Sequence, residues 1–416
     1  MTPQIKQRIE QIRRGEVLEG YKKTKAGVIP SEWELRPLSK HLTESRIPGT
    51  NGAIAKKLTV KLWNKGVFEK REVHEGSEST TYYKRKAGQL IYSKLDFLNC
   101  AFGIIPDHLN DYESTQDLPC FDISDVDPYY LLTYVTQRNF YTHFGMIADG
   151  GRKARRVGPE DMLSFPLIYP SFPEQEKIAE ILSAQDKLIA LKEKLIEEKK
   201  RQKKALMQQL LTGKRRAPGF SVEWKKQRMA DVLRERKEEN KEQLLRICSV
   251  AVNSGVVDQR EHLGKIMAAS DTSNYNVVHY GDVVYTKSPT GEFPFGIVKQ
   301  SQLAENVAVS PLYGVYEPAT YEIGYLLNEY FMYSNNTNAY LLPIVNKGAK
   351  NTINISNSTF ITPSLYLPTD FEEIKKLVRI FKTANKEIEI LQKDLDQEKQ
   401  KKKALMQLLL TGIVRV

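Results

Sequence analysis

The chain has 416 residues, of which 41% are hydrophobic and 27% charged, and Lys and Arg exceed Asp and Glu by 62 to 51, a formal net charge of +11. This length allows about two to three domains with normal cores, and the basic excess favours a polyanionic partner. Three cysteines without a C-x-x-C pair argue against a disulfide scaffold or a structural zinc site. Since no run reaches the roughly 18 apolar residues of a membrane span, we expect a soluble, unprocessed cytoplasmic protein.

A short helix is expected at the N-terminus, where Thr2 can cap it, Gly15 can stop it, and Ile5, Ile9 and Ile12 form an apolar stripe. Residues 1–20 are therefore assigned to this helix and the start of a linker. The segment 16–28 has no apolar period and is interpreted as linker.

Two globular segments, 21–172 and 214–370, repeat one another. Glu32 and Trp33 align with Glu223 and Trp224, and the string GQLIYSKLDFLNCAFGII from Gly88 aligns with GDVVYTKSPTGEFPFGIV from Gly281. Both strings are typical of strands joined by a polar turn. Between such anchors the halves differ, and the segment TVKLWNKGVFEKREVHEGSESTTYYKRK has no counterpart beyond its length. A shared scaffold with a divergent surface is expected for two versions of one binding module with different ligands.

Each globular segment is followed by a long helix, at 173–213 and 371–416. KKALMQQLLTG at 203–213 returns as KKALMQLLLTG at 402–412, an offset of 199 residues. The apolar residues of the second copy follow alternating spacings of four and three, which indicates a heptad seam, whereas the seam of the first copy is polar in its middle. We predict that the two copies pair antiparallel within one molecule. Two separate amphipathic helices that each cover their own domain are the alternative.

The order of the parts resembles a ring of two units opened at one joint. The first helix continues through LLTGKRRAPGFSVEW into the second domain, whereas the second ends at LLTGIVRV and its continuation, KKTKAGVIPSEW, lies near the N-terminus. We therefore expect the two termini to lie close together. We also expect residues 1–213 alone to dimerise through the first helix.

No catalytic signature is complete. Asp127 to Tyr130 spell DPYY, close to the DPPY of amino-methyltransferases, but no glycine-rich turn for S-adenosylmethionine accompanies them. Asp127 as the cap of a helix that begins at Pro128 is the preferred interpretation. Gly145 to Gly150 and Gly291 to Gly296 lack the Gly-Lys-Ser/Thr of a phosphate-binding loop. The six histidines have no ligand spacing, so no metal site is predicted.

Basic loops are the strongest functional signal. GGRKARR at 150–156 joins two glycines to four cations, and NKGAKNT at 346–352 is its counterpart. Arginine can bond guanine or phosphate, and asparagine suits adenine. A solvated basic loop is the alternative for each cluster, and TYYKRK at 81–86 is equally compatible with DNA contact and a strand edge. The predicted DNA-binding residues are Ser93, Lys94, Arg152, Lys153, Arg155, Arg156, Lys287, Ser288, Thr290, Lys347, Lys350 and Asn351.

The whole chain resembles the specificity subunit of a type I restriction-modification enzyme. The resemblance rests on EGYKKTKAGVIPSEWE, the G-x-L/V-I/V-Y-S/T-K strings, PSFPEQEKIAEIL and the repeated KKALMQ-x-LLTG. It implies an α+β fold with two mixed α/β target recognition domains, separated by two long antiparallel helices in a pseudo-two-fold arrangement. One departure is that PTDFEEIKKL begins the second helix where the first has PSFPEQEKI.

The resemblance implies a non-catalytic subunit whose two domains each read half of a bipartite, asymmetric DNA site, with the helices setting the spacer. Two methyltransferase subunits that modify adenine-N6 with S-adenosylmethionine are implied partners. Two restriction subunits that use ATP and Mg can join them. No cofactor is expected on this chain itself. A coiled-coil scaffold with non-specific DNA binding and a stand-alone DNA methyltransferase are the rival interpretations.

The apolar ends of the two helices are the predicted methyltransferase contact, because they carry more apolar residues than a two-helix seam needs. Packing of the same residues against a recognition domain is the alternative. The predicted partner-binding residues are Leu206, Met207, Leu210, Leu211, Leu405, Met406, Leu409 and Leu410.

Overall fold

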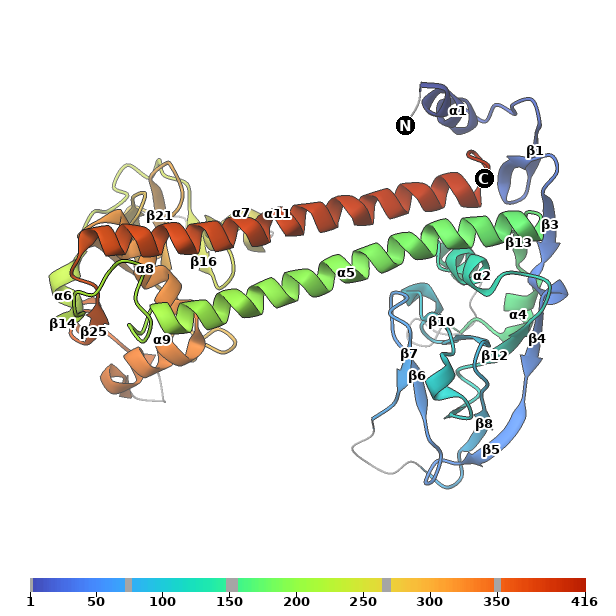
Figure 1. Cartoon of the computed structure of the whole chain (residues 1–416), viewed down its shortest axis with the longest axis horizontal. Helices are drawn as coiled ribbons and strands as arrows, with labels where there is room; N and C mark the ends of the chain where they lie inside the picture. Colours follow the sequence, from blue (N-terminus) through green and yellow to red (C-terminus); the bar gives the residue numbers. More distant parts are fainter. Residues whose placement is uncertain (1–2, 72–76, 147–155, 264–270, 348–352) are drawn as a thin grey trace. The chain divides into compact units, whose positions relative to one another are not determined.

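The computed structural model describes residues 3–71, 77–146, 156–263, 271–347 and 353–416 (Figure 1). The chain divides into two compact units. Unit 1 comprises Met1–Glu193 and Asp394–Val416, and unit 2 comprises Lys194–Lys393. Two long helices, α5 (Phe172–Leu210) and α11 (Phe371–Leu410), each contribute one part to each unit.

Unit 1 is a mixed α/β domain with short strands, and none of its described strands exceeds five residues. Before α5 its elements are α1 (Pro3–Arg13), β1 (Tyr21–Thr24), β2 (Gly27–Pro30), β3 (Glu34–Pro37), η1 (Leu38–Lys40), β4 (Leu42–Ser45), β5 (Ile47–Asn51), β6 (Leu58–Val60), β7 (Val67–Glu69), β8 (Thr81–Lys84), β9 (Leu90–Tyr92), η2 (Phe97–Asn99), β10 (Phe102–Ile104), η3 (Asp107–Leu109), β11 (Glu113–Ser114), β12 (Cys120–Ile123), α2 (Pro128–Val135), α3 (Arg138–Gly145), α4 (Pro159–Ser164) and β13 (Pro166–Tyr169).

Unit 2 has a related order of elements between α5 and α11. They are β14 (Lys225–Arg228), α6 (Met229–Val232), β15 (Leu233–Glu235), β16 (Cys248–Ala251), β17 (Gly255–Asp258), α7 (Gln259–Leu263), β18 (Asn276–Val278), β19 (Val283–Tyr285), β20 (Val298–Gln300), β21 (Val307–Val309), β22 (Gly314–Pro318), α8 (Tyr321–Phe331), α9 (Ser334–Leu341), η4 (Leu342–Ile344), β23 (Asn346–Lys347), β24 (Ile353–Asn354), α10 (Asn357–Phe360) and β25 (Ser364–Leu367).

The central sheets of the two units have the same topology. Their strand orders are β10-β9-β12-β4 and β20-β19-β22-β15, and every pair is antiparallel. A two-stranded hairpin stands at the same place in each unit, β6–β7 in one and β16–β17 in the other. The segment after Leu58, for which the sequence shows no counterpart beyond its length, therefore has a counterpart in the backbone pairing of the second unit.

The predicted α+β fold class is confirmed, and the long helices contribute to the cores of both units. One cluster gathers the aromatic residues of the first domain around Leu409 and Leu410 of α11, and the second gathers those of the other domain around Met207 and Leu210 of α5. Burial of these apolar and aromatic side chains against the helices contributes to the attachment, because apolar area removed from water is the main favourable term in folding.

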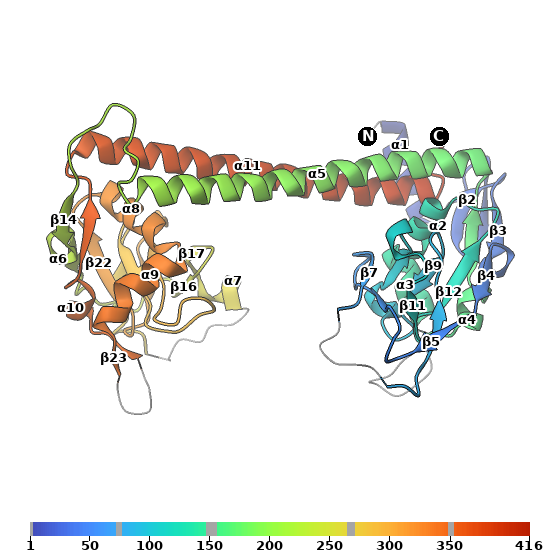
Figure 2. The ribbon, with the colours of Figure 1, turned by 60° about the horizontal axis from the view of Figure 1, so that its bottom comes forward.

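In each unit, a stretch of α5 lies antiparallel to a stretch of α11 (Figure 2). In unit 1, Asp186 pairs with Lys402 and Lys192 pairs with both Asp394 and Glu398. In unit 2, Lys199 pairs with Glu387. The polar middle of the first seam therefore has acidic partners on the other helix.

The segment 16–28, interpreted as linker, instead contains most of a β-hairpin formed by β1 and β2. Gly27 has φ of 110° in its turn, a conformation that few other residues adopt. The Tyr21 hydroxyl donates to the Gly412 carbonyl at 2.9 Å, and Arg8 donates to the Ile413 carbonyl at 2.9 Å. These contacts confirm that the two ends of the chain lie close together (Figure 1).

An Arg-Glu-Trp cluster closes each unit at the start of a long helix. In unit 1 the carboxylate of Glu174 accepts from Trp33 Nε1 and from both Arg415 nitrogens. In unit 2, Glu373 accepts from Trp224 Nε1 and from Arg216 in the same way. We call these the unit 1 clasp and the unit 2 clasp. The divergent entry PTDFEEIKKL thus keeps the one carboxylate that this geometry requires.

Candidate nucleic-acid and partner interface

The structure brings together two of the segments predicted to contact DNA in unit 1. Val157, at the end of the basic loop, donates its backbone N–H to the Lys94 carbonyl at 3.2 Å, and Lys94 donates its own to Asp117 at 3.0 Å. Arg156 is exposed, with its Nε 3.7 Å from an Asp117 carboxylate oxygen. Lys94 and Arg156 therefore belong to one surface. Arg152, Lys153 and Arg155 lie outside the described residues.

Ser93 is not available for DNA contact in this structure. Its side chain is buried, its hydroxyl donates to Asp96 at 3.1 Å, and it accepts the Asp96 backbone N–H at 3.2 Å. A short polar side chain that bonds to the backbone a few residues on stabilises a turn. The premise that Ser93 is an accessible loop residue is wrong, since it fixes the turn that presents Lys94.

In unit 2 the corresponding loop after β19 is exposed to solvent. Ser288 and Thr290 are exposed, and Thr290 exchanges two backbone hydrogen bonds with Phe293. Lys287 is half-buried, and burial lowers the pKa of its ammonium group. Lys347 ends β23, which pairs with β24, while Lys350 and Asn351 lie outside the described residues.

Two further segments singled out in the sequence have structural roles. Arg85 of TYYKRK is fully buried, donates to Ser114 Oγ at 2.8 Å and to the Ser45 carbonyl at 2.8 Å, and joins two sheets. Asp127 caps α2 by accepting the Tyr130 N–H at 2.7 Å, with Pro128 at the first position. The structural interpretation of DPYY is therefore confirmed.

The predicted partner-binding residues pack inside their own units. Met207, Leu210, Leu211, Leu409 and Leu410 are buried, and Leu206, Leu405 and Met406 are partly buried against the same cores. The premise that they are exposed is wrong, because the recognition domain of each unit covers the end of the helix and uses its apolar face. The alternative interpretation, packing against a domain, describes these side chains.

Equivalent clefts adjoin the long helices in the two units. In unit 1 a cleft of about 540 Å³ lies between Trp63 at the tip of the β6–β7 hairpin, Tyr129 of α2, and the Asp186–Lys402 pair. In unit 2 a cleft of about 510 Å³ lies between the tip of the β16–β17 hairpin, α8 and α11. Both are bordered by the edge strand of the central sheet, β10 or β20.

The carboxylate beside the cleft belongs to a different helix in each unit. Asp186 of α5 accepts from Tyr129 and pairs with Lys402. Its equivalent in α11, 199 residues on, is Asn385, which donates to Glu329 of α8 at 3.1 Å. Glu329 is 1% exposed and pairs with Lys203 at 3.2 Å.

Lys299 of β20 is also buried beside this second cleft, at 2% exposure, and donates to the Met332 sulfur at 3.1 Å. Burial lowers the pKa of its ammonium to about 8, an effect that the nearby Glu329 carboxylate opposes.

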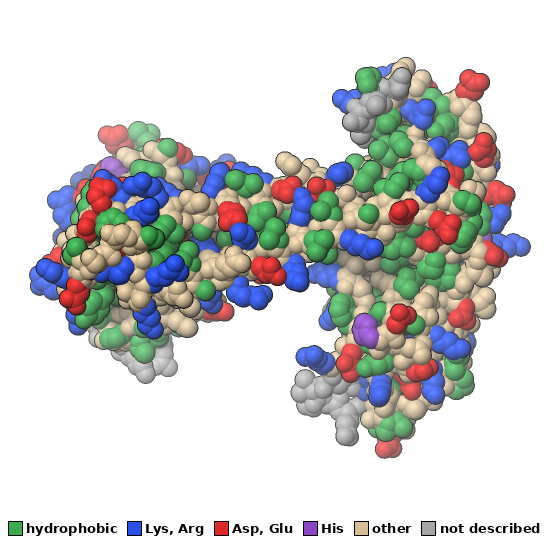
Figure 3. Space-filling model, viewed as in Figure 1, with side chains coloured by type: hydrophobic (Ala, Val, Ile, Leu, Met, Phe, Trp, Pro, Cys, Tyr) green, Lys and Arg blue, Asp and Glu red, His purple; other side chains and the backbone are tan. Residues whose placement is uncertain are grey.

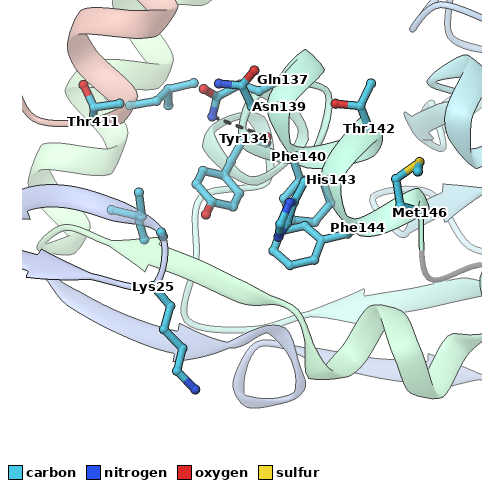
Figure 4. A pocket seen from close by; sticks show the side chains of 13 residues that line it. Lys25, Tyr134, Gln137, Asn139, Phe140, Thr142, His143, Phe144, Met146 and Thr411 are labelled. Atoms are coloured by element: carbon cyan, nitrogen blue, oxygen red, sulfur yellow. Dashed lines mark hydrogen bonds between the residues drawn. The ribbon is translucent and has the colours of Figure 1, made fainter. Parts of the chain in front are cut away.

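A further pocket of about 610 Å³ occurs in unit 1 (Figure 4). Residues of α3, including His143 and Phe144, line one side, and Lys25 of the β1–β2 turn and Thr411 line the other. The only hydrogen bond drawn among its labelled residues, from Gln137 Nε2 to the Tyr134 carbonyl at 3.4 Å, lies within the turn between α2 and α3.

Within the described part of the chain, no group of three or more His, Cys, Asp or Glu side chains could hold a metal ion. None of its described helices is long and apolar enough to cross a membrane. Cys100, Cys120 and Cys248 are free and buried, and burial raises the pKa of each thiol.

Residues 121–201 match the family model described as a type I restriction modification DNA specificity domain. An S subunit of a type I restriction-modification system from M. genitalium is 11% identical over 91% of this chain and 96% of its own, with a TM-score of 0.52. A chain from a structural study of complex assembly in the type I R-M system is 14% identical over 93% and 99%, with a TM-score of 0.53. The HsdS subunit of Thermoanaerobacter tengcongensis is 14% identical over 93% and 98%, with a TM-score of 0.46.

The fold defines a class of protein with two similar mixed α/β domains and two long helices, a fold shared with the S subunits at TM-scores above 0.5. The specificity-domain match extends from β12 into α5, so it includes the first basic segment and part of the first long helix. Residues 121–201 are thus similar to a type I restriction-modification DNA specificity domain, and the chain as a whole shares its fold with a solved S subunit.

Proposed function

We propose that this chain directs a type I methyltransferase and restriction complex to a bipartite, asymmetric DNA site, with each recognition domain reading one half-site. The observation that carries the proposal is the identical strand order of the two units, combined with different side chains in equivalent loops. Two identical readers would suit a palindrome, as in symmetric dimers. Two readers whose equivalent turns continue as Leu95 and Asp96 in one and as Ser288 and Pro289 in the other suit two different half-sites.

The catalytic step belongs to the partner in this proposal. Methyltransferase subunits modify adenine-N6 with S-adenosylmethionine, and restriction subunits, where present, use ATP and Mg. This chain binds none of these cofactors itself. The reduced, buried cysteines are consistent with a cytoplasmic complex.

The test is single-molecule mapping of N6-methyladenine in DNA from cells that express the chain with its candidate methyltransferase. One bipartite asymmetric motif is expected. Lys94→Ala with Arg156→Ala should weaken recognition of one half-site and leave the other intact, because base contacts specify sequence locally. Lys40→Ala, an exposed cation of the same unit, is the matched control. No motif beside a methyltransferase that is active with another specificity subunit would favour a scaffold without sequence reading.

We also propose a new methyltransferase contact in place of the buried helix ends. Leu191 of α5 and Ile390 of α11 occupy equivalent positions, 199 residues apart, and are 65% and 55% exposed. Apolar side chains are visible among the charged ones along the helices (Figure 3). Exposed apolar groups repeated at equivalent positions, each on a helix that borders a cleft, suit two copies of one protein partner.

Leu191→Glu and Ile390→Glu should each remove one methyltransferase copy, and the double variant should remove both. The mass of the purified complex, measured by light scattering, distinguishes two copies, one and none. Leu312→Asp is a matched control, because Leu312 is 69% exposed but lies in the loop between β21 and β22. A double variant that still binds two copies would disprove this contact.

A further inference from the structure

The charged residues in the middle of α5 and α11 distinguish one helix from the other. Positions 199 residues apart occupy the same place in α5 and α11, as the two clasps show: Glu174 matches Glu373, and Arg216 matches Arg415. By this correspondence, Lys199 of α5 stands where α11 has Glu398, and Lys192 stands where α11 has Leu391. The two helices are therefore alike in their ends but differ in charge at their middle.

In the native arrangement every one of these central charges has an opposite partner. In unit 1, Lys192 lies beside the carboxylates of Asp394 and Glu398, 3.4 Å from the latter. The two side chains are only 19% and 17% exposed, so neither charge is freely solvated. In unit 2, Lys199 pairs with Glu387.

In a helix pair made from two copies of α5, like charges would face each other at these positions. Lys192 would then meet Lys199 of the second copy in place of Glu398, and Leu195 in place of Asp394. The Asp186 and Glu193 pairs would survive, because Lys203 and Lys200 replace Lys402 and Lys399. Only the centre of the pair therefore distinguishes the two arrangements.

Two copies of α11 are disfavoured by the opposite charge. Glu387 would meet Glu398 of the second copy in place of Lys199, and Leu391 would replace the lysine that neutralises Asp394 and Glu398. Charged side chains beside a helix seam select partners by attraction to the right one and repulsion from the wrong one.

We infer that the central charges of α5 and α11 form a pairing code that rejects a second copy of the same helix and selects the other one. This code opposes the expectation that residues 1–213 dimerise through α5. Its consequence is that two different recognition domains are joined, and that association of like halves between two molecules is suppressed. The inference concerns how the chain associates with itself, and it holds whether or not the proposed DNA function is correct.

Single substitutions in the full chain reproduce the rejected contacts inside one molecule. Glu398→Lys places a lysine opposite Lys192, as a second α5 would, and Glu398→Gln removes the charge without reversing it. Glu398→Lys is expected to lower the melting temperature by a few degrees more than Glu398→Gln. Equal melting temperatures for the two variants would overturn the code.

A complementary pair of chains tests selection directly. One chain carries Lys192→Glu, and the other carries Asp394→Lys with Glu398→Lys. Each is mismatched within itself, but α5 of either chain matches α11 of the other, so co-expressed chains with different tags should form a 1:1 complex of twice the monomer mass. Wild-type chains with the same tags should stay monomeric. Variants that remain separate when co-expressed would overturn the inference.

A third variant keeps the test decisive if either mismatched chain folds poorly. Combining Lys192→Glu, Asp394→Lys and Glu398→Lys in one chain restores every central pair with its signs reversed. This chain should be monomeric and should melt within about 2 °C of wild type, since the same charge pairs form with their signs exchanged. A triple variant that melts no higher than the mismatched chains would show that something other than charge complementarity matters there.

Discussion

The unit 1 clasp and the unit 2 clasp have the same Arg-Glu-Trp geometry but different connectivity. In unit 2, Arg216 and Trp224 belong to one continuous segment between α5 and β14, so the chain itself keeps them near Glu373. In unit 1, Arg415 and Trp33 come from opposite ends of the chain, and Arg415 contacts Glu174, Glu32 and the face of the Trp33 ring. A covalent connection in unit 2 is thus replaced by side-chain contacts in unit 1.

The largest effect is expected from removing a clasp carboxylate. The Glu373 side chain is fully buried and that of Glu174 nearly so, and each neutralises an arginine. Glu174→Ala and Glu373→Ala should each cost about 3 kcal/mol, because a buried tryptophan N–H loses its acceptor and a partly exposed arginine loses its ion pair. Denaturant unfolding of the full chain, followed by tryptophan fluorescence, measures it. Because Trp33 is held by no covalent link to the arginine, Arg415→Ala should disturb its clasp more than Arg216→Ala; equal losses would contradict this comparison.

A second difference between the units is the buried lysine of unit 2. Lys299 has a folded pKa of about 8, below its unfolded value of 10.5, so between these pH values the unfolded state binds more protons and stability rises with pH. The gain is on the order of 3 kcal/mol at most. Lys299→Met should abolish this part of the pH dependence, and the difference between melting temperatures of variant and wild type from pH 7.5 to 10 measures it. A pH-independent difference would show that Lys299 titrates normally.

The glycines that follow the two long helices differ in the space available for an added Cβ atom. Gly412 and Gly213 have φ of 69° and 68°, but an added Cβ at Gly412 would lie 2.4 Å from Pro30 Cγ, whereas at Gly213 the nearest atom is Trp224 Cε3 at 3.3 Å. Gly412→Ala should therefore cost about 1 to 3 kcal/mol, more than Gly213→Ala. Denaturant midpoints at constant m-value test this order. The reverse order would mean that the β1–β2 hairpin shifts at Pro30 and accommodates the added Cβ atom at little energetic cost.

The smallest effect is expected at the carboxylate beside the cleft, which is Asp186 of α5 in unit 1 and Glu329 of α8 in unit 2. Asp186→Asn makes unit 1 resemble unit 2 at this position without supplying an equivalent of Glu329. Because the Asp186 side chain is 39% exposed, the loss should be below about 1 kcal/mol. Asn385→Asp places a second carboxylate beside buried Glu329 and should cost more. Thermal melting of the two variants compares them, and equal shifts would argue against a burial effect.

The sequence alone determined the repeat, the two long helices, the ring order and the mixed α/β class. It could do so because heptad spacing and strand alternation are local patterns that survive divergence, and because PEQEKIAEIL and KKALMQ-x-LLTG recur or resemble a known family. It also placed Asp127 correctly, since an N-cap followed by proline is defined by neighbours in the chain.

Only the tertiary structure decided which side chains are exposed and which partners they have. Met207 and Leu410 are apolar on helices in either case, and burial by a domain distant in sequence is what removes them from the partner surface. The same is true of Ser93 and Arg85, whose hydrogen-bond partners fix their role, and of the β16–β17 hairpin, whose backbone pairing leaves no side-chain signature. The code in the middle of the helices likewise depends on which charges face each other. Long-range contact between segments hundreds of residues apart is a property that no local pattern contains.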